Sequence, residues 1–233
     1  MSKWHKISLY KFQLIDNLGV NKSMSDIDKA LFSTCIVFGL TEHQLDNAGK
    51  KKADRLIGKL TKIFEAPFEP KPAKRIGKYF INYDISAMTF GQYIELAYFL
   101  SIDTLKNAHY IIASISNLPL LKNNSAHHRK KSEYFLGQSI LKVMGSVGLI
   151  KQRFEEFNNE YKSLFGLDKT VNGEAETDPF NKRYGWIYSA SQVAEYERIT
   201  LEGAFKLPIR QAFNDLAYLK AKSKYEADQL NKK

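Results

Sequence analysis

The spacing of apolar side chains predicts a chain built mainly of amphipathic helices. In residues 53–64, apolar side chains recur every three or four positions, lysines occupy the opposite side, and Pro67 follows the last of them. A longer helical pattern runs from Lys131 to about Phe165. A last stripe begins just after Pro208 and is followed by a charged tail. Each stripe needs a surface to pack against, so the pattern favours a multi-helix bundle.

Side chains that cap helices stand before several of these stripes. A hydroxyl or carboxylate oxygen at such a position accepts a hydrogen bond from a backbone N–H group that the helix leaves unpaired. The predicted capping residues are Ser25, Thr41, Thr89 and Asp103. The segment KISLYKFQLIDNL could form a short strand or a first helix, and we favour a helix that starts near Ser8. Gly39 suits the end of the helix that begins after Ser25. The helix that begins after Asp103 is expected to end before Pro119.

One short region has the alternation of a β-strand. Three prolines, Pro67, Pro70 and Pro72, form an extended connector, and the sequence IGKYFINYD then interleaves apolar or aromatic residues with polar ones. We therefore expect a mainly α fold, a multi-helix bundle with one short β-hairpin or strand pair near residues 76–84.

Three glycines fall inside the long helical pattern. Gly137, Gly145 and Gly148 each cost about 1 kcal/mol relative to alanine in a helix interior. Their density predicts either close packing against this helix or a break near Gly145.

The polar run LDKTVNGEAETDP predicts a linker. The expected division is an N-terminal helical region (1–66), a central domain with short strands and long helices (67–168), a linker (169–179) and a C-terminal helical module (180–233). The module opens with an aromatic cluster around RYGWIY, where Gly185 is expected to let the chain turn. Trp186 either packs on this chain's own Phe213 and Leu216, or carries the module onto another subunit.

The charge balance favours acidic partners. The chain has 233 residues, a net charge of +10 and a pI near 9.4. The basic clusters are scattered, and no single helix is expected to be densely basic on one face, so a solvated surface is preferred to a nucleic-acid site. No apolar run is long enough to span a bilayer, and the N-terminus lacks the pattern of a secretory signal.

The sequence offers few residues in catalytic patterns. It has neither a phosphate-binding glycine-rich loop nor a GxSxG motif. His127 and His128 are adjacent and point apart on a helix, and His109 falls in an apolar helix, so no metal site is expected. Cys35 lies in an apolar helical stretch and is expected to be a buried hydrophobe in a reducing cytoplasm. We expect a protein that is not an enzyme, with no catalytic, cofactor-binding or metal-binding residues.

Two stretches resemble a known group of proteins. Residues 78–100, with MTFGQYIELAYFL, and residues 199–230, beginning ITLEGAFKLPIRQ, are similar to bacteriophage tail assembly chaperones and tail-associated assembly proteins. The resemblance implies a helical protein without catalytic residues. It also implies partners among other phage proteins, namely the tape measure protein or tail and connector subunits. The implied location is the host cytoplasm during assembly, with the virion as the alternative.

Three functional hypotheses remain open from the sequence. The first is a tail assembly chaperone that covers apolar stripes of tape measure helices with its own amphipathic helices. The second is a structural virion component such as a head–tail or tail ring subunit, and the third is a basic nucleic-acid-binding protein; a homo-oligomer also stays open. Candidate partner-binding residues, each of which could instead fill the core, are Trp186, Tyr188, Phe205, Phe213 and Tyr93.

Overall fold

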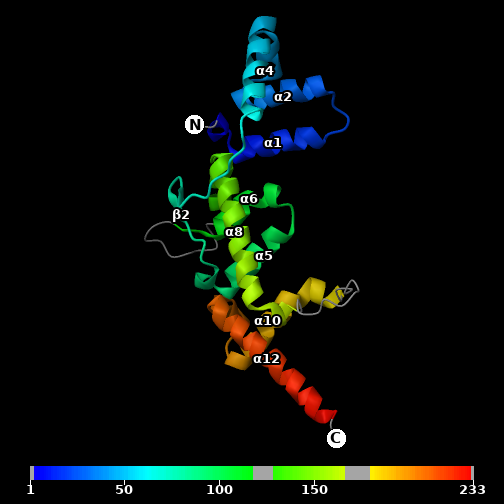
Figure 1. The fold of residues 1–233 in the computed structure, drawn as a ribbon, viewed down its shortest axis with the longest axis vertical. Helices are drawn as coiled ribbons and strands as arrows, with labels where there is room; N and C mark the ends of the chain where they lie inside the picture. The colour runs from blue at the N-terminus through cyan, green and yellow to red at the C-terminus, as the bar shows by residue number, and fades with distance from the viewer. Residues whose placement is uncertain (1–2, 118–127, 166–178, 232–233) are drawn as a thin grey trace. The chain divides into compact units, whose positions relative to one another are not determined.

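The computed structural model describes residues 3–117, 128–165 and 179–231, and within these ranges the chain is mainly helical, as the sequence predicts (Figure 1). The chain forms two compact units. Unit 1 combines Met1–Asn82 with Phe99–Leu149, and unit 2 combines Tyr83–Tyr98 with Ile150–Lys233. The sequence-based division used consecutive pieces, whereas each unit is made of two separated segments. The predicted linker, apart from Pro179, lies outside the described residues.

Unit 1 holds the N-terminal helices together with α6 and α7. The bounds of these helices are η1 Lys3–Lys6, α1 Leu9–Val20, α2 Asp26–Phe38, α3 Glu42–Asp46, α4 Lys50–Phe64, α6 Thr104–Ser114 and α7 His128–Leu136. The predicted caps are confirmed. Ser25 accepts a hydrogen bond from the backbone N–H group of Asp28, and Thr41 forms a full capping box with Gln44. The first helix starts where it was favoured, and Ser8 caps it by accepting a hydrogen bond from the backbone N–H group of Lys11. Gly39 ends α2 with φ at 68°, a conformation in which a side chain would be strained.

The stripe predicted for α4 packs within unit 1. Leu60 and Ile63 are buried, and Phe64 meets the ring of Trp4 edge-on at a centroid distance of 5.1 Å. Phe68 also meets Trp4 edge-on, at 5.2 Å, and the indole nitrogen of Trp4 donates a hydrogen bond to the carbonyl oxygen of Ala66 at 2.9 Å. The apolar side of α4 is therefore held against η1 and the segment that follows the helix.

The expected strand pair is present and has a third member. Strands β1 (Arg75–Ile76), β2 (Tyr79–Ile81) and β3 (Ser116–Asn117) form an antiparallel sheet in the order β1-β2-β3. Gly77, with φ at 57°, makes the tight turn between β1 and β2. The helix expected to end before Pro119 ends at Ser114, and Ser116 and Asn117, which follow it, pair with β2.

The long helical pattern after Lys131 divides into α7, α8 (Ile140–Glu160) and α9 (Lys162–Phe165). The first break lies between α7 and α8, at residues 137–139. There the backbone N–H of Leu9 donates a hydrogen bond to the carbonyl oxygen of Gln138, and the N–H of Ile140 donates one to the carbonyl oxygen of Ile7. No break occurs at Gly145, where the alternative prediction of close packing is confirmed, because the backbone of Lys71 lies where a Cβ atom would project.

Unit 2 is built around an aromatic core. Its elements are η2 Ile85–Ala87, the first part of α5 (Phe90–Ser101), the end of α8, α9, α10 (Pro179–Glu197), α11 (Leu201–Lys206) and α12 (Ile209–Leu230). Thr89 and Gln92 form the capping box of α5. The backbone N–H of Phe90 donates a hydrogen bond to the carbonyl oxygen of Leu207, and the N–H of Ile209 donates one to the carbonyl oxygen of Met88. These two hydrogen bonds join the start of α5 to the start of α12.

Candidate functional site

Tyr93 lies at the centre of the core of unit 2. Its ring stacks on Phe154 at a centroid distance of 4.9 Å and meets the edges of Phe213 at 4.9 Å and Trp186 at 5.8 Å. The hydroxyl group donates a hydrogen bond to Asn158 Oδ1 at 2.5 Å, and burial raises the pKa of Tyr93 above its ordinary value. The phenol is therefore a neutral, satisfied core group.

The five candidate contact residues divide between this core and the surface. Tyr93 and Phe213 are buried within unit 2 and belong to its core. Trp186 and Phe205 are partly buried, and both rings lie near Phe90. Tyr188 is 50% exposed. Gly185 is inside α10 and not at a turn. Trp186 thus packs on this chain's own aromatic core, and Tyr188 is the candidate most open to solvent.

A groove runs between α10 and α12 in unit 2, and we call it the α10–α12 groove. It has a volume of about 620 Å³. The lining residues are Leu164, Trp186, Tyr188, Ser189, Gln192, Phe213, Leu216, Leu219, Lys220, Ser223, Lys224 and Ala227. The floor is apolar and aromatic, and two lysines stand on the α12 side. Three of the sequence-predicted candidates, Trp186, Tyr188 and Phe213, therefore meet at one surface feature.

The lining of the groove continues along the end of α12. Every residue of α12 from Ala221 to Leu230 is exposed, and Figure 1 shows this end of the helix extending past α10. Leu219, Ser223, Ala227 and Leu230 follow one another at intervals of three or four residues, so they share one side of the helix. Leu230 is 73% exposed. The described part of unit 2 leaves this side of α12 uncovered.

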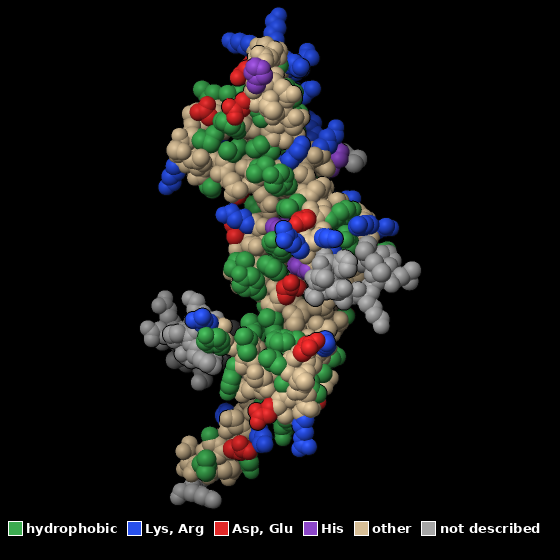
Figure 2. All heavy atoms as spheres, turned by 180° about the vertical axis from the view of Figure 1, so that it is seen from behind, with side chains coloured by type: hydrophobic (Ala, Val, Ile, Leu, Met, Phe, Trp, Pro, Cys, Tyr) green, Lys and Arg blue, Asp and Glu red, His purple; other side chains and the backbone are tan. Residues whose placement is uncertain are grey.

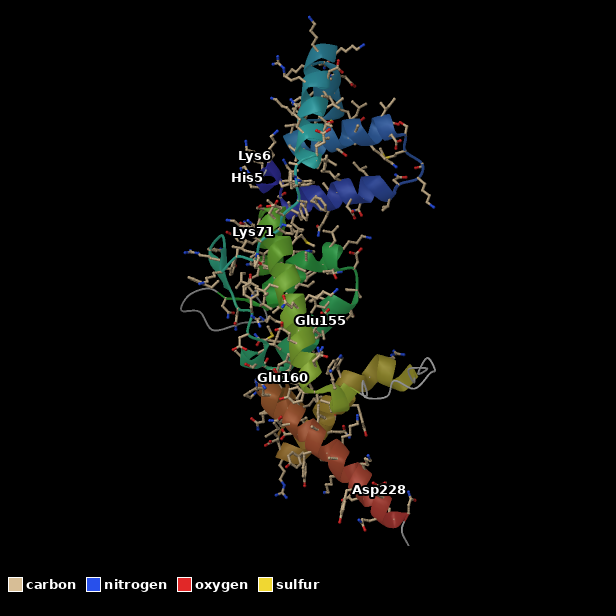
Figure 3. The ribbon with its side chains drawn as sticks, viewed as in Figure 1. His5, Lys6, Lys71, Glu155, Glu160 and Asp228 are labelled. Carbon is tan, nitrogen blue, oxygen red and sulfur yellow. The ribbon has the colours of Figure 1, made fainter. Side chains whose placement is uncertain are left out.

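A second hollow in unit 2 has a polar lining. It has a volume of about 370 Å³ and lies beside η2 and the end of α8. Arg210 pairs with Glu160 at 2.8 Å, and Arg153 pairs with Glu156 at 2.8 Å; Glu160 is labelled at the end of α8 in Figure 3. All four side chains are about half exposed, so these ion pairs are solvated and contribute little. The two arginines and two glutamates that line this hollow are therefore already paired with each other.

Two carboxyl groups lie together where α10 ends. Oδ2 of Asp215 is buried without a hydrogen-bond partner, and Glu197 lies beside it. Burial, followed by the negative charge of Glu197, raises the pKa of Asp215 to about 6. Glu197 also accepts a hydrogen bond from Gln211 at 3.0 Å. Asp215 and Glu197 are far apart in sequence, and no local pattern marks the pair.

The histidines and the cysteine have structural surroundings. His128 lies 3.3 Å from Ser114 Oγ and stacks near Tyr110, while His127 is outside the described residues. Burial, with the nearby His128, lowers the pKa of His109. Cys35 is buried, as expected, and burial raises the pKa of its thiol. Within residues 3–117, 128–165 and 179–231, no group of three His, Cys, Asp or Glu side chains could hold a metal ion.

Comparisons with family models, with curated proteins and with solved structures found no match for this chain. Among the helices of the described ranges, none has the length and apolar character needed to cross a membrane.

Proposed function

We propose that this chain is a non-enzymatic assembly protein of a tailed bacteriophage, and specifically a tail assembly chaperone. In this proposal an amphipathic helix of the tape measure protein, or of a tail subunit, binds in the α10–α12 groove. The observation that carries the proposal is the groove itself, whose apolar lining continues onto an exposed end of α12. The resemblance of residues 78–100 and 199–230 to phage assembly proteins supports the same partner class.

The chemistry of the groove suits a helix. Helices pack at interaxial distances of about 8–10 Å, and small residues permit the closer approach. Ser223 and Ala227 are small, and Leu219 and Leu230 flank them with apolar side chains. Each large apolar side chain that a partner buries there would contribute about 1.5–3 kcal/mol. A partner stripe with residues at positions i, i+3 and i+7 would match this side of α12.

The exposed end of α12 is consistent with a helix that needs a partner. Helical segments shorter than about 12–15 residues are marginal in water when no tertiary contact covers them. Every residue from Ala221 to Leu230 is exposed, and Lys222 forms an ion pair with Glu226 along this segment. A bound helix would supply the missing contacts. Lys224, on the groove side, would favour acidic residues at the edge of the partner's stripe.

A matched pair of variants tests the groove. Ala227→Arg places a long cation in the lining, whereas Ala221→Arg makes the same change on another side of the same exposed helical segment. We expect co-expression with a tape measure protein to give a soluble complex for the unmodified chain and for Ala221→Arg. We expect Ala227→Arg to lose the complex on size-exclusion chromatography.

Two results would overturn the proposal. One is the absence of any complex between the unmodified chain and the tape measure protein. The other is equal binding by Ala227→Arg and Ala221→Arg. A fixed copy number of the chain in purified virions, measured by mass spectrometry, would replace the chaperone with a structural virion component.

A further inference from the structure

Helix α4 has a dense band of positive charge along one side. The helix carries six basic residues and a single acidic one, Asp54, which gives its fifteen residues a net charge of +5. At about 100° per residue, five of the cations fall within an arc of about 100°. These five define the basic face: Lys51, Lys52, Arg55, Lys59 and Lys62. The expectation that no single helix is densely basic on one face is therefore wrong for α4, because helical spacing aligns cations that are scattered in the sequence.

Among the described residues, no acidic side chain pairs with the cations of the basic face. All five side chains are exposed, and none takes part in an ion pair with another described residue. Figure 2 shows blue side chains gathered over the part of unit 1 that α4 forms. Lys3 and Lys6, on the adjoining η1, are exposed as well, and Lys6 is labelled in Figure 3 beside α4. Mutual repulsion among these charges would be relieved by a polyanion.

The apolar side of α4 bears on whether the polyanion is a membrane surface. A helix that binds a membrane surface inserts its apolar side between the lipids. In α4 that side is already occupied, because Leu60 and Ile63 are buried and Phe64 packs on Trp4. Insertion would require these contacts to break. The arrangement therefore favours a partner that is recognised by charge alone.

The geometry points to the phosphate backbone of a nucleic acid duplex, and we propose that the basic face of α4 binds it without reading its sequence. From Lys51 to Lys62 the face is about 16 Å long, at about 1.5 Å per residue. Phosphates follow one another every 3.4 Å along the axis of each strand, so several lie within reach of the five cations. The arc holds no aromatic, Asn or Gln side chain that could stack on or pair with a base. This surface is in unit 1 and is independent of the α10–α12 groove.

The salt dependence of binding gives a direct measure of the contact. If all five cations neutralise a phosphate, log K should fall against log[salt] with a slope of about −4.5 for a DNA duplex. A fourfold rise in salt would then weaken binding about 500-fold. We would measure fluorescence anisotropy of a labelled DNA duplex of about 20 base pairs, and repeat the titration with an RNA duplex and with a DNA duplex of shuffled sequence.

A fourfold variant removes most of the basic face. Its substitutions are Lys51→Gln, Arg55→Gln, Lys59→Gln and Lys62→Gln. Glutamine has nearly the same helix propensity as lysine or arginine, and the sites are exposed, so the circular dichroism spectrum should not change. We expect the slope to rise to about −1 and the affinity at low salt to fall at least about 100-fold, because one of the five cations remains.

A control variant makes the same change in net charge elsewhere. Its substitutions are Lys22→Gln, Lys142→Gln, Lys151→Gln and Lys162→Gln, all at exposed positions that lie outside α4. The control should keep the slope of the unmodified chain. Equal binding of both DNA sequences and of the RNA duplex would support recognition of the shared phosphate backbone.

Several results would overturn the inference. One is the absence of duplex binding by the unmodified chain at low salt, and another is equal binding by the α4 variant and the control. Tighter binding to vesicles that contain phosphatidylserine than to the duplex would replace nucleic acid with a membrane surface. A marked preference for one of the two DNA sequences would contradict binding through the backbone alone.

Discussion

Replacing Gly145 by alanine tests the closest approach between two segments of unit 1. The added methyl group would lie 2.5 Å from the backbone nitrogen of Lys71 and closer still to its carbonyl group. Real Cβ atoms do not approach other heavy atoms so closely, so the Lys71 segment would have to move. Pro72 restricts the backbone there, and the N–H of Ala73 donates to Ser146 Oγ at 3.2 Å. Movement would therefore strain this connection to α8.

The expected magnitude follows from two opposing effects. Alanine is favoured over glycine in a helix interior by about 1 kcal/mol, whereas overpacking of a filled site costs about 1–3 kcal/mol. The obstacle at Gly145 is backbone, which places the cost near the upper end, and loss of the bond from Ala73 would add about 1 kcal/mol. We expect a net destabilisation of about 3 kcal/mol. Gly148 is in the same helix and has no atom within 4 Å of an added Cβ, so Gly148→Ala should stabilise by about 1 kcal/mol.

Urea unfolding can separate these effects because each unit contains one tryptophan. Trp4 is in unit 1 and Trp186 is in unit 2. In a Trp186→Phe background, fluorescence reports unit 1 alone, which matters because a chain of two units need not unfold in one step. We expect the midpoint to fall for Gly145→Ala and to rise for Gly148→Ala. Midpoints that move together, or a stabilised Gly145→Ala, would refute the assigned packing of Lys71 on α8.

Two further substitutions test unit 2. The pKa of Asp215 is raised from 3.8 to about 6 beside Glu197. Between these pH values the folded chain keeps a proton on Asp215, whereas the unfolded chain has released it. The free energy of unfolding therefore falls as the pH rises through this window. Asp215→Asn should therefore raise the melting temperature by a few degrees at pH about 7.5 and converge with the unmodified chain near pH 4; an equal shift at both pH values would contradict this linkage. Tyr93→Phe removes the hydroxyl that donates to Asn158 and should cost about 1–2 kcal/mol in chemical denaturation, whereas Tyr218→Phe, at a side chain that is 53% exposed, should cost almost nothing.

Features set by neighbours along the chain could be predicted from the sequence. The caps at Ser25 and Thr41, and the helix end at Gly39, depend on groups within four residues of each other. The hairpin at residues 75–81 is equally local, since one tight turn joins its strands. The apolar stripe of α4 could be read from the sequence because it also depends on residues three or four positions apart. A projection of the lysines onto the same helix would have revealed the basic face as well.

Features set by distant pairing could not be predicted in this way. Ser116 and Asn117 have no strand pattern and become a strand only because β2 lies beside them. The break before α8 depends on hydrogen bonds from the distant Leu9 and to the distant Ile7. The α10–α12 groove was indicated only by its aromatic residues. Trp186 and Phe213 were identified, but composition could not separate the buried ring of Phe213 from the partly exposed ring of Trp186.

The discontinuous make-up of unit 2 has a consequence for synthesis on the ribosome. Phe90 and Tyr93 belong to its core, yet their partner Phe213 is translated about 120 residues after Tyr93. At a translation rate of about 5–20 residues per second, Phe213 is synthesised about 6–24 s after Tyr93. Throughout this interval the beginning of α5 carries apolar side chains without their final neighbours. The nascent chain is therefore most open to aggregation, or to capture by host chaperones, before α12 has left the exit tunnel.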